Sequence, residues 1–524
     1  MTEIDRPSPT KPLMSFSTTK TQRRLLLMAA AVSSSCGLAV ELLLGTLASY
    51  LVGNQALAYG VAVGGFLAAM GIGSYISKFI ATDSKSSSLQ RDLLSAFVKV
   101  ELLIAPATAL LPLGLFALFV ANGNLWLGLS FATVLLGMLA GLEVPLLTRV
   151  LELESDLKDA LAGVLALDYI GALFGSIAFP LLLLPFCGLF PTGFILGSLP
   201  AIMVFLLGSN FSQLKFWKYI GLAIAALLLA TAPISIPFTN RLENNLYEAP
   251  IIKRIQSPYQ RIVLTRQGRD VRLFLDGDLQ LSTIDEHRYH EALIHPAMSA
   301  AANPKKILLM GAGDGMALRE ILKWSSVEKV ILIELDPMVV RLARSYPQLR
   351  QVNHDAFTDE RVEVVYGDAF LKLAHLPETF DVIVADFPDP DRKILAKLYS
   401  EGFYRRMLSR LSDKGIFVTQ ASSPFFAPKV ISCIRQTIKY VGLQTYPYVI
   451  NVPSFGSWGF VLASRDRIDT QKLKLPIETR FLTESVMSNL FDLPKDINLQ
   501  QVDINRLSNP VIVRYQADNR WFHY

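Results

Sequence analysis

Hydrophobic residues divide the chain into two parts of different character. Before about residue 237, long apolar runs are separated by short polar turns, whereas charged residues become frequent beyond it. The apolar runs cover 25–52, 56–80, 95–121, 124–148, 160–185, 189–208 and 218–237. Each is long enough to cross a hydrocarbon core about 30 Å thick as a helix, and the runs lack the amphipathic period of soluble helices. Residues 25–237 are therefore predicted to form a transmembrane domain with about seven segments.

The start of the chain agrees with a membrane anchor. Residues 1–24 are polar, contain several prolines and are expected to form a tail. Arg23 and Arg24 lead directly into the first apolar run, which has no small-residue cleavage site and is followed by further runs. This run is therefore predicted to be an anchor and not a cleaved signal peptide, with the lipid bilayer as its partner.

Lysine and arginine are distributed unevenly among the turns. They precede the first run and then occupy every second turn, while the intervening turns carry none. The residues concerned are Lys20, Arg23, Arg24, Lys78, Lys85, Arg91, Arg149, Lys158, Lys215 and Lys218. Because loops rich in positive charge stay on the cytoplasmic side, the N-terminus is predicted to be cytoplasmic.

Several acidic residues lie within the apolar runs. Glu41, Glu143 and Asp168 are costly in hydrocarbon, and they mark either a polar path or interhelical hydrogen bonds, of which hydrogen bonding is favoured. Glu101 is expected near the start of the third run, within reach of the interface. Close helix packing is expected at two pairs of small residues, Gly60-x-x-x-Gly64 and Gly171-x-x-x-Gly175.

The second half predicts strands first and then an alternation of strands and helices. Residues 261–265 and 271–275 are typical of antiparallel strands, within a small β-domain at 245–300. In the segment 301–465, strands are predicted at 307–310, 329–333, 361–365, 382–385 and 415–419. Their alternation with helices indicates a doubly wound, mostly parallel α/β sheet of the Rossmann-like methyltransferase type. Residues 466–524 form a C-terminal extension to which no role is assigned.

The fold class predicted is thus a multi-pass α-helical membrane domain, followed by the small β-domain and the Rossmann-like domain. Composition changes this picture little. Hydrophobic residues make up 51% of the chain and charged residues 18%, with a net charge of +5 and no long block of one sign, so nucleic-acid binding is not expected. Cys36, Cys187 and Cys433 are far apart and form no CxxC pattern, so neither a disulfide framework nor a zinc site is predicted.

A glycine-rich turn follows the strand predicted at 307–310. It reads Gly311-Ala-Gly-Asp-Gly315, and glycines at this place let the backbone approach a nucleoside closely. Asp314 within the turn would repel a pyrophosphate and attract a cation. About twenty residues on, Glu334 ends the next strand, where an acid accepts from ribose hydroxyls. Acids at both positions favour a positively charged adenosyl sulfonium, although Glu334 is also placed to cap a helix.

Acidic residues also follow the third and fourth of these strands. Asp368, followed by Ala369, is placed either to accept from an adenine amino group or to cap the next helix. Asp386 and Asp389 come after the fourth strand, on the carboxyl side of the sheet where ligands bind. One could act as a base towards an amine while the other holds a distant ammonium. Turn formation is the alternative for Asp389-Pro390.

A polar segment upstream combines acids with tyrosine and histidine. Residues 275–280 (LDGDLQ) and 285–291 (DEHRYHE) could line an acidic pocket or form a solvated helix face. His287, His290 and Glu291 share a helix face, but no fourth ligand or HExxH spacing accompanies them. No metal site is therefore expected.

Taken in order, these motifs resemble the spermidine synthase family of aminopropyltransferases, and the multi-pass N-terminal region resembles its membrane-bound bacterial branch. The resemblance runs from about Pro258 to Ser464 and rests on Tyr259-Gln260, LDGDLQ, DEHRYHE, GAGDG, ELDP, GDA and DFPDP. It implies transfer of the aminopropyl group of decarboxylated S-adenosylmethionine to putrescine or another polyamine, with release of 5′-methylthioadenosine. The nucleoside is a co-substrate, and no prosthetic group is implied. Whether the protein forms a homo-oligomer stays open.

The resemblance also implies roles for individual residues. Asp314 would hold the primary amine of the donor, Glu334 its ribose and Asp368 its adenine, and Asp386 would be the catalytic base. The further donor contacts implied are Gln260, His290 and Ala369, and the acceptor contacts are Tyr289 and Asp389.

Two departures from the family pattern lie on the acceptor side. Residues 391–397 carry Arg392, Lys393 and Lys397, which are an unfavourable wall for a polycation. Phe455 occupies the place of an acceptor-site tyrosine. The alternatives that remain are an S-adenosylmethionine-dependent methyltransferase, which Asp314 disfavours, and a membrane polyamine transporter or sensor, which Asp386 disfavours.

The side of the membrane follows from two opposing arguments. Seven crossings from a cytoplasmic N-terminus would place the catalytic domain outside, whereas the nucleoside donor is made in the cytosol. The catalytic domain is therefore predicted to be cytosolic, at the cell (inner) membrane, and one segment not to cross. The segment chosen is 218–237, because Pro233 and Pro237 interrupt its end and Trp217 and Tyr219 suit the interface.

Overall fold

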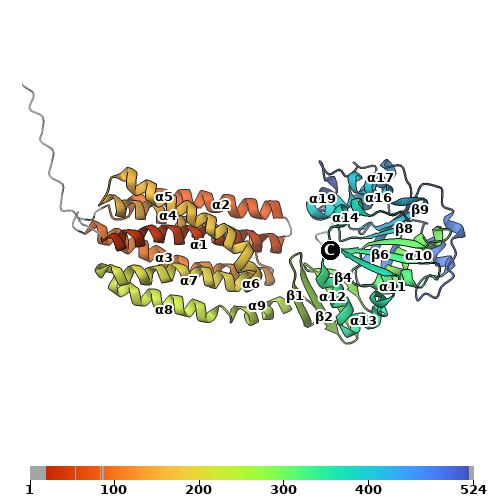
Figure 1. Cartoon of the computed structure of the whole chain (residues 1–524), viewed down its shortest axis with the longest axis horizontal. Helices are drawn as coiled ribbons and strands as arrows, with labels where there is room; N and C mark the ends of the chain where they lie inside the picture. Colours follow the sequence, from red (N-terminus) through yellow and green to blue (C-terminus); the bar gives the residue numbers. More distant parts are fainter. Residues whose placement is uncertain (1–18, 53–54, 83, 85–87, 518–524) are drawn as a thin grey trace, which may run out of the picture. The chain divides into compact units, whose positions relative to one another are not determined.

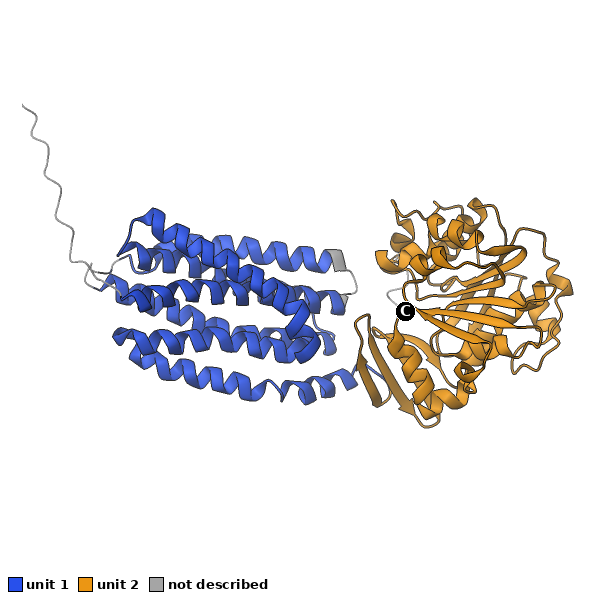
Figure 2. Ribbon diagram, viewed as in Figure 1, with its two compact units in different colours: residues 1–248 blue, residues 249–524 orange. Residues whose placement is uncertain are grey.

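The protein folds as two compact units, residues 1–248 and 249–524 (Figure 2). The computed structural model describes residues 19–52, 55–82, 84 and 88–517. Most of the predicted tail, as well as Lys85, lies outside the described residues. The two units are described separately below.

The first unit is a bundle of long helices (Figure 1). They are α1 (Lys20–Val52), α2 (Gln55–Ile76), α3 (Leu89–Val120), α4 (Leu125–Glu152), α5 (Leu157–Ala178), α6 (Leu184–Cys187), α7 (Leu189–Asn210), α8 (Lys215–Thr231) and α9 (Ser235–Asn244). A π-helical turn joins α5 to α6. Among the described residues, seven helical stretches are long and apolar enough to cross a membrane, which agrees with the predicted number. Helix α1 begins at Lys20, within the segment 1–24 predicted as a tail.

Small residues bring several of these helices into close contact. A Cβ atom on Gly171 or Gly175 of α5 would lie 2.0 Å from the Ala31 carbonyl oxygen or 2.2 Å from that of Ser35, both in α1. Close packing at this pair is therefore confirmed. The prediction for Gly60 and Gly64 is wrong, because a Cβ atom there would meet nothing within 4 Å.

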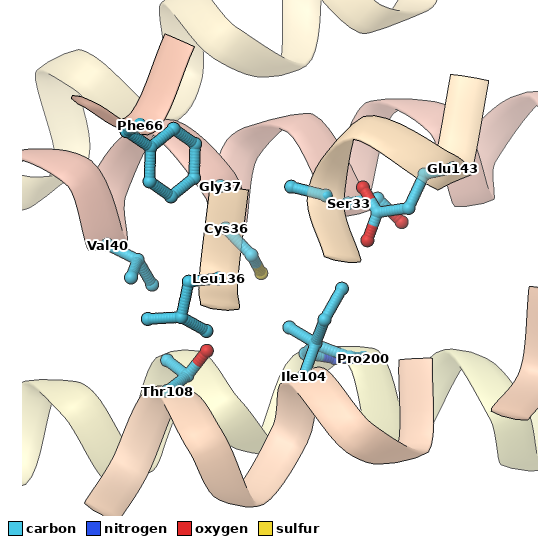
Figure 3. A pocket seen from close by; sticks show the side chains of 11 residues that line it. Ser33, Cys36, Gly37, Val40, Phe66, Ile104, Thr108, Leu136, Glu143 and Pro200 are labelled. Atoms are coloured by element: carbon cyan, nitrogen blue, oxygen red, sulfur yellow. The ribbon is translucent and has the colours of Figure 1, made fainter. Parts of the chain in front are cut away.

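Polar groups gather inside the bundle. Glu101 is fully buried and accepts a hydrogen bond from Ser33 of α1. Since α3 begins at Leu89, Glu101 lies deeper in the helix than the interfacial position expected for it. Figure 3 shows Ser33 and Glu143 at one end of a cavity of about 10 Å³, with the Thr108 hydroxyl facing it from α3. The expected interhelical hydrogen bonding is present at Asp168, which accepts from Ser34. Glu101 forms such a bond as well, although it was expected near the interface.

Proline residues leave carbonyl groups in the bundle without their helical donors. Pro145 of α4 frees the carbonyl of Gly141, which accepts from Ser74 Oγ over 2.9 Å. Pro200 of α7 frees the carbonyl of Leu196, which Cys36 Sγ contacts at 3.7 Å. Neighbouring helices thus supply the donors that a lipid environment cannot.

The second unit begins with a four-stranded antiparallel sheet in the order β1-β2-β3-β4. The strands are β1 (Ile251–Gln256), β2 (Arg261–Gln267), β3 (Asp270–Leu275) and β4 (Asp278–Ser282). Asp276 and Gly277 both have positive φ, as the tight turn between β3 and β4 requires. The predicted strands at 261–265 and 271–275 lie in β2 and β3.

A seven-stranded mixed sheet follows, in the order β10-β11-β9-β8-β5-β6-β7. The strands are β5 (Lys306–Gly311), β6 (Lys329–Glu334), β7 (Val362–Tyr366), β8 (Phe380–Asp386), β9 (Leu411–Gln420), β10 (Gln444–Val452) and β11 (Gly456–Ser464). Strands β5 to β9 are parallel, while β10 and β11 pair antiparallel. Residues 307–310 of β5 are fully buried, as expected for a central strand covered on both faces.

Helices connect these strands and complete the unit. They are α10 (Glu286–Ala300), α11 (Met316–Leu322), α12 (Pro337–Ser345), α13 (Pro347–Asn353), α14 (Ala369–His375), α15 (Lys393–Ala396), α16 (Glu401–Leu408), α17 (Pro428–Tyr440), α18 (Glu484–Asn489) and α19 (Val511–Gln516). The C-terminal extension packs on this core: Glu291 of α10 accepts from the backbone N–H groups of residues 480–482, and Val511 and Ile512 are buried.

Candidate active site

The glycine-rich turn after β5 draws acidic residues of two neighbouring strands together. Gly311 has φ +79°, and a Cβ atom there would lie 2.0 Å from the carbonyl oxygen of Asp386 at the end of β8. A Cβ atom on Gly313 would lie 2.8 Å from Glu334 Oε2 at the end of β6. Only glycine leaves room for both approaches, so the turn brings Asp314, Glu334 and Asp386 to one edge of the sheet.

The three acids predicted to contact the nucleoside donor share one local geometry. Asp314, Glu334 and Asp368 each accept a hydrogen bond from the backbone N–H two residues further on, over 2.8, 2.9 and 2.9 Å. The bond to Asp368 caps α14, whose first residue is the buried Ala369. One carboxylate oxygen of Asp368 therefore acts as a helix cap, which was the alternative to a contact with adenine. Burial and the nearby charges of Asp336 and Asp314 raise the pKa of Glu334 to about 7.

Gln260 lies beside the same edge of the sheet. It precedes β2 and donates from Nε2 to Asp336 Oδ2 over 3.1 Å. Ser257 donates to the same oxygen over 2.6 Å. The small antiparallel sheet is thereby joined to the segment that carries Glu334, which supports the placement of Gln260 near the donor acids.

Asp386 is held by a phenol from α10. Tyr289 donates its hydroxyl hydrogen to Asp386 Oδ1 over 2.6 Å, and its ring lies edge-on to Phe455 with 5.9 Å between centroids. Burial raises the pKa of Asp386 to about 6, although the charge of His290 and the Tyr289 hydrogen bond act against the rise. The carboxyl group therefore titrates closer to neutrality than an exposed aspartate.

His290 is held by a pair of residues that the sequence analysis did not single out. Its Nδ1 lies 2.8 Å from Glu286 Oε2, and Arg319 donates from both terminal nitrogens to the Glu286 carboxylate, over 2.9 and 3.0 Å. Burial lowers the pKa of His290, but the Glu286 hydrogen bond and the charges of Asp314, Glu286 and Asp386 outweigh it and raise that pKa to about 9. His290 is thus positively charged at neutral pH.

Asp389 accepts hydrogen bonds from neutral side chains that the sequence pattern did not reveal. Ser422 and Gln516 donate to its Oδ2 over 2.8 and 2.9 Å, and Gln420 donates to its Oδ1 over 3.3 Å. Gln420 and Ser422 lie at the end of β9, and Gln516 ends α19. Burial raises the pKa of Asp389, against the effect of these hydrogen bonds. Sequence separations of 31 to 127 residues explain why no local pattern revealed the group.

The loop at 391–397 is not the cationic wall that the sequence suggested. Arg392 forms an ion pair with Asp276 over 3.1 Å, and Lys397 pairs with Asp368. Burial and the neighbouring Asp391 raise the pKa of Asp278 to about 6 on the same side. The prediction of an unfavourable wall is therefore corrected, because acids of the site neutralise two of the three cations.

The α10 face that carries His287, His290 and Glu291 does not converge on one point, because its side chains have different partners. His290 contacts Glu286, while Glu291 is occupied by the backbone of residues 480–482. Within the part of the chain that the structure describes, no three His, Cys, Asp or Glu side chains are arranged to hold a metal ion.

Together these residues can hold a cationic substrate and accept a proton from it. Two half-buried carboxyl groups lie at the end of β8 and just after it, and three further acids line the neighbouring strand ends. A carboxylate near the reacting atoms can serve as a general base, and the other acids stabilise positive charge.

Comparisons with known proteins decide which chemistry this is. The family described as "Spermine/spermidine synthase domain" matches residues 286–472. Polyamine aminopropyltransferase 2 of Ralstonia nicotianae is 41% identical over 502 residues, which cover 94% of this chain and 97% of that protein. The chain belongs to the polyamine aminopropyltransferase family.

A further curated relative agrees with this assignment. The polyamine aminopropyltransferase of Leptospira interrogans is 38% identical over 501 residues, covering 95% of this chain and 98% of that protein. A crystal structure of spermidine synthase in complex with the transition state analogue AdoDATO is 33% identical, with a TM-score of 0.45, and covers 47% of this chain and 86% of its own. The similarity to the aminopropyltransferases thus includes the helical unit.

The protein is therefore a spermidine synthase-like aminopropyltransferase of polyamine biosynthesis, with a helical region apolar enough to form a multi-pass membrane anchor. Its relatives support aminopropyl transfer over the methyltransferase and transporter alternatives.

Proposed function

We propose that this aminopropyltransferase moves the aminopropyl group of decarboxylated S-adenosylmethionine to a diamine such as putrescine, releasing 5′-methylthioadenosine. The observation that carries the proposal is Asp386, a half-buried carboxyl group at the end of β8 that touches both the glycine-rich turn and Tyr289. This position lies where parallel α/β sheets bind their ligands.

The donor occupies the glycine-rich edge of the sheet in this proposal. Asp314 holds its primary ammonium, Glu334 its ribose hydroxyls and Asp368 with Ala369 its adenine, while Gln260 and His290 complete the pocket. Each of the three acids has one oxygen fixed by the backbone. Carboxylates oriented in advance in this way bind a cationic nucleoside without further ordering of their side chains.

Asp386 is the catalytic base. An alkylamine with a pKa near 10 is mostly protonated at neutral pH, so a carboxylate must take its proton before the nitrogen can react. The free amine then attacks the carbon next to the sulfonium. A C–N bond forms, the C–S bond breaks, and its electron pair returns to sulfur to give the neutral thioether.

The acceptor lies between Tyr289 and Asp389. Tyr289 fixes the orientation of Asp386, and Asp389 receives the distal ammonium of the diamine. Asp389 is suited to this role because it is half-buried and its partners are the neutral side chains of Ser422, Gln420 and Gln516, so the carboxylate favours a cation.

The direct test is incubation of purified full-length protein with decarboxylated S-adenosylmethionine and a panel of amines, followed by mass spectrometry. We expect 5′-methylthioadenosine and one amine that gains an aminopropyl group. The absence of transfer to every amine, with intact folding confirmed by donor binding, would overturn the proposal.

We further propose that the catalytic unit faces the cytosol of the cell, at the inner membrane, because the donor is made in the cytosol. The chain must then cross the membrane an even number of times between its cytoplasmic N-terminus and α9. Helix α8 is the one proposed not to cross. Its 17 residues extend about 26 Å, less than a hydrocarbon core of about 30 Å, and it ends at Thr231, before Pro233.

An opposing observation makes the experiment decisive. Helix α8 lies antiparallel along α7, with Gly208 against Lys218 and Gly221 against Ala201, as a spanning helix would. Seven spanning helices would place the N-terminus and the catalytic unit on opposite sides of the membrane. A reporter active only in the cytosol and one active only outside, each fused after Tyr524, separate these outcomes. Activity of the cytosolic reporter alone supports the proposal, whereas activity of the outside reporter alone overturns it.

A further inference from the structure

Among the described residues of the C-terminal extension, Gln516 contacts the acceptor end of the active site. Gln516 is the last residue of α19, and it donates from Nε2 to Asp389 Oδ2 over 2.9 Å. Its Oε1 faces the Ser422 hydroxyl at 3.4 Å. The contact joins residues 127 positions apart, so it depends on how the extension folds back.

The other two donors to Asp389 belong to the sheet. Gln420, at the end of β9, also donates to the Phe387 carbonyl oxygen over 2.6 Å, and the backbone N–H of Ser422 donates to Gln420 Oε1 over 2.7 Å. These bonds fix one side of Asp389 whatever the extension does. Of the described side chains that donate to Asp389, Gln516 is the one that comes from outside the sheet.

Helix α19 holds Gln516 in place by burying its first two residues. Val511 and Ile512 are fully buried in the hydrophobic core that also contains Ile434 and Ile438 of α17. Arg514, on the same helix, is exposed. The helix therefore has one face anchored in the core, and its last residue extends to the acceptor carboxylate.

We propose that Gln516 is a specificity-determining residue that sets the length of the amine acceptor. The proposal rests on the function proposed for Asp389 and extends it. A diamine places its distal ammonium on Asp389 and ends there, because the Gln516 amide already occupies the approach to Oδ2 from α19. A longer amine must displace Gln516 to continue past Asp389.

Charge acts in the same direction as this steric barrier. The Gln516 amide donates a hydrogen bond but carries no negative charge, so it gives a further ammonium no ionic partner beyond Asp389. A carboxylate at the same position would supply one, since hydrogen bonds between charged groups are about twice as strong as those between neutral ones. Gln516→Glu therefore extends the acidic end of the site.

The experiment compares acceptors of different length with the full-length enzyme. Initial rates are measured with decarboxylated S-adenosylmethionine and a series of α,ω-diamines, together with a triamine that carries one more aminopropyl unit. The variants are Gln516→Glu and Gln516→Ala, with Arg514→Ala as a matched control on the exposed face of α19. We expect Gln516→Glu to raise the kcat/KM ratio of triamine to diamine about tenfold or more. Gln516→Ala should raise the same ratio by a smaller factor, and Arg514→Ala should leave it unchanged.

The outcomes separate this inference from the proposed function. Wild-type enzyme that transfers no aminopropyl group to any amine overturns the proposed function itself. Active wild-type enzyme whose two Gln516 variants keep the wild-type preference for acceptor length overturns only the role of Gln516. A change in the KM of the donor nucleoside as large as the change in the KM of the amines would also overturn the role of Gln516. Such a result would show a structural effect on the whole site.

Discussion

The donor and acceptor halves of the active site are built in different ways. On the donor half, Asp314, Glu334 and Asp368 follow three strands of one sheet, and each is fixed by the backbone N–H two residues later. On the acceptor half, Asp389 depends on side chains from the end of β9 and from α19, up to 127 residues away. The donor half is thus fixed locally and the acceptor half by tertiary packing, so substitutions should affect the two halves separately.

The largest effect is expected where the two halves meet. Asp386→Asn removes the proposed base but keeps the shape of the side chain, so turnover should fall by about a hundredfold or more while the donor nucleoside still binds. Steady-state rates and calorimetry with the donor nucleoside measure the two effects. Asp381→Asn, at the opposite end of the same strand, is the matched control. Full turnover in Asp386→Asn at saturating substrates would exclude Asp386 as the base.

This difference also explains what the sequence could predict. The strand positions and the donor acids were accessible because buried apolar runs end at acidic residues, a pattern that needs no knowledge of distant parts of the chain. Gln420, Ser422 and Gln516 carry no local signal, and their role appears only when β9 and α19 meet Asp389.

The errors in the prediction have the same origin. The apolar run starting at residue 95 predicts Glu101 at an interface, whereas the helix extends back to Leu89 and buries Glu101. The charges of the 391–397 loop alone predict a cationic wall, whereas Arg392 and Lys397 are paired with Asp276 and Asp368. Sequence shows charge, but packing decides which partner neutralises it.

The next largest effect concerns the choice of donor. In the proposed function, Asp314 faces the end of the nucleoside that carries a carboxylate in S-adenosylmethionine and lacks one in the decarboxylated form, and opposed like charges are costly. Asp314→Asn should therefore reduce the preference for the decarboxylated donor by about tenfold or more. Calorimetry with both nucleosides gives the ratio directly. Tighter binding of the intact cofactor by the wild-type protein would contradict the assigned role of Asp314.

A smaller effect is expected in the pH profile. The pKa of Asp386 is raised to about 6, so kcat should fall as pH drops through about 6 and the base becomes protonated. The Tyr289 hydrogen bond lowers that pKa, so Tyr289→Phe should move the midpoint upward, by roughly one pH unit. A profile of kcat against pH for both proteins measures the shift, and a midpoint that stays in place or moves down would contradict it.

The smallest effect tests the boundary between the halves. Lys397 lies in the loop assigned to the acceptor side, yet it pairs with the donor acid Asp368. Because both side chains are partly exposed, Lys397→Ala should weaken donor binding by less than about fivefold. The KM of the diamine should not change. A larger change for the diamine than for the donor would place Lys397 on the acceptor half.

One competition experiment tests the central claim most directly. Purified wild-type protein is incubated with a diamine and equal amounts of decarboxylated and intact S-adenosylmethionine. Each nucleoside carries a different isotope label in its transferable groups, and the mass of the product amine is measured by mass spectrometry. The account predicts a product that has gained only the labelled aminopropyl group, with matching release of 5′-methylthioadenosine. A product that has gained a labelled methyl group would contradict it.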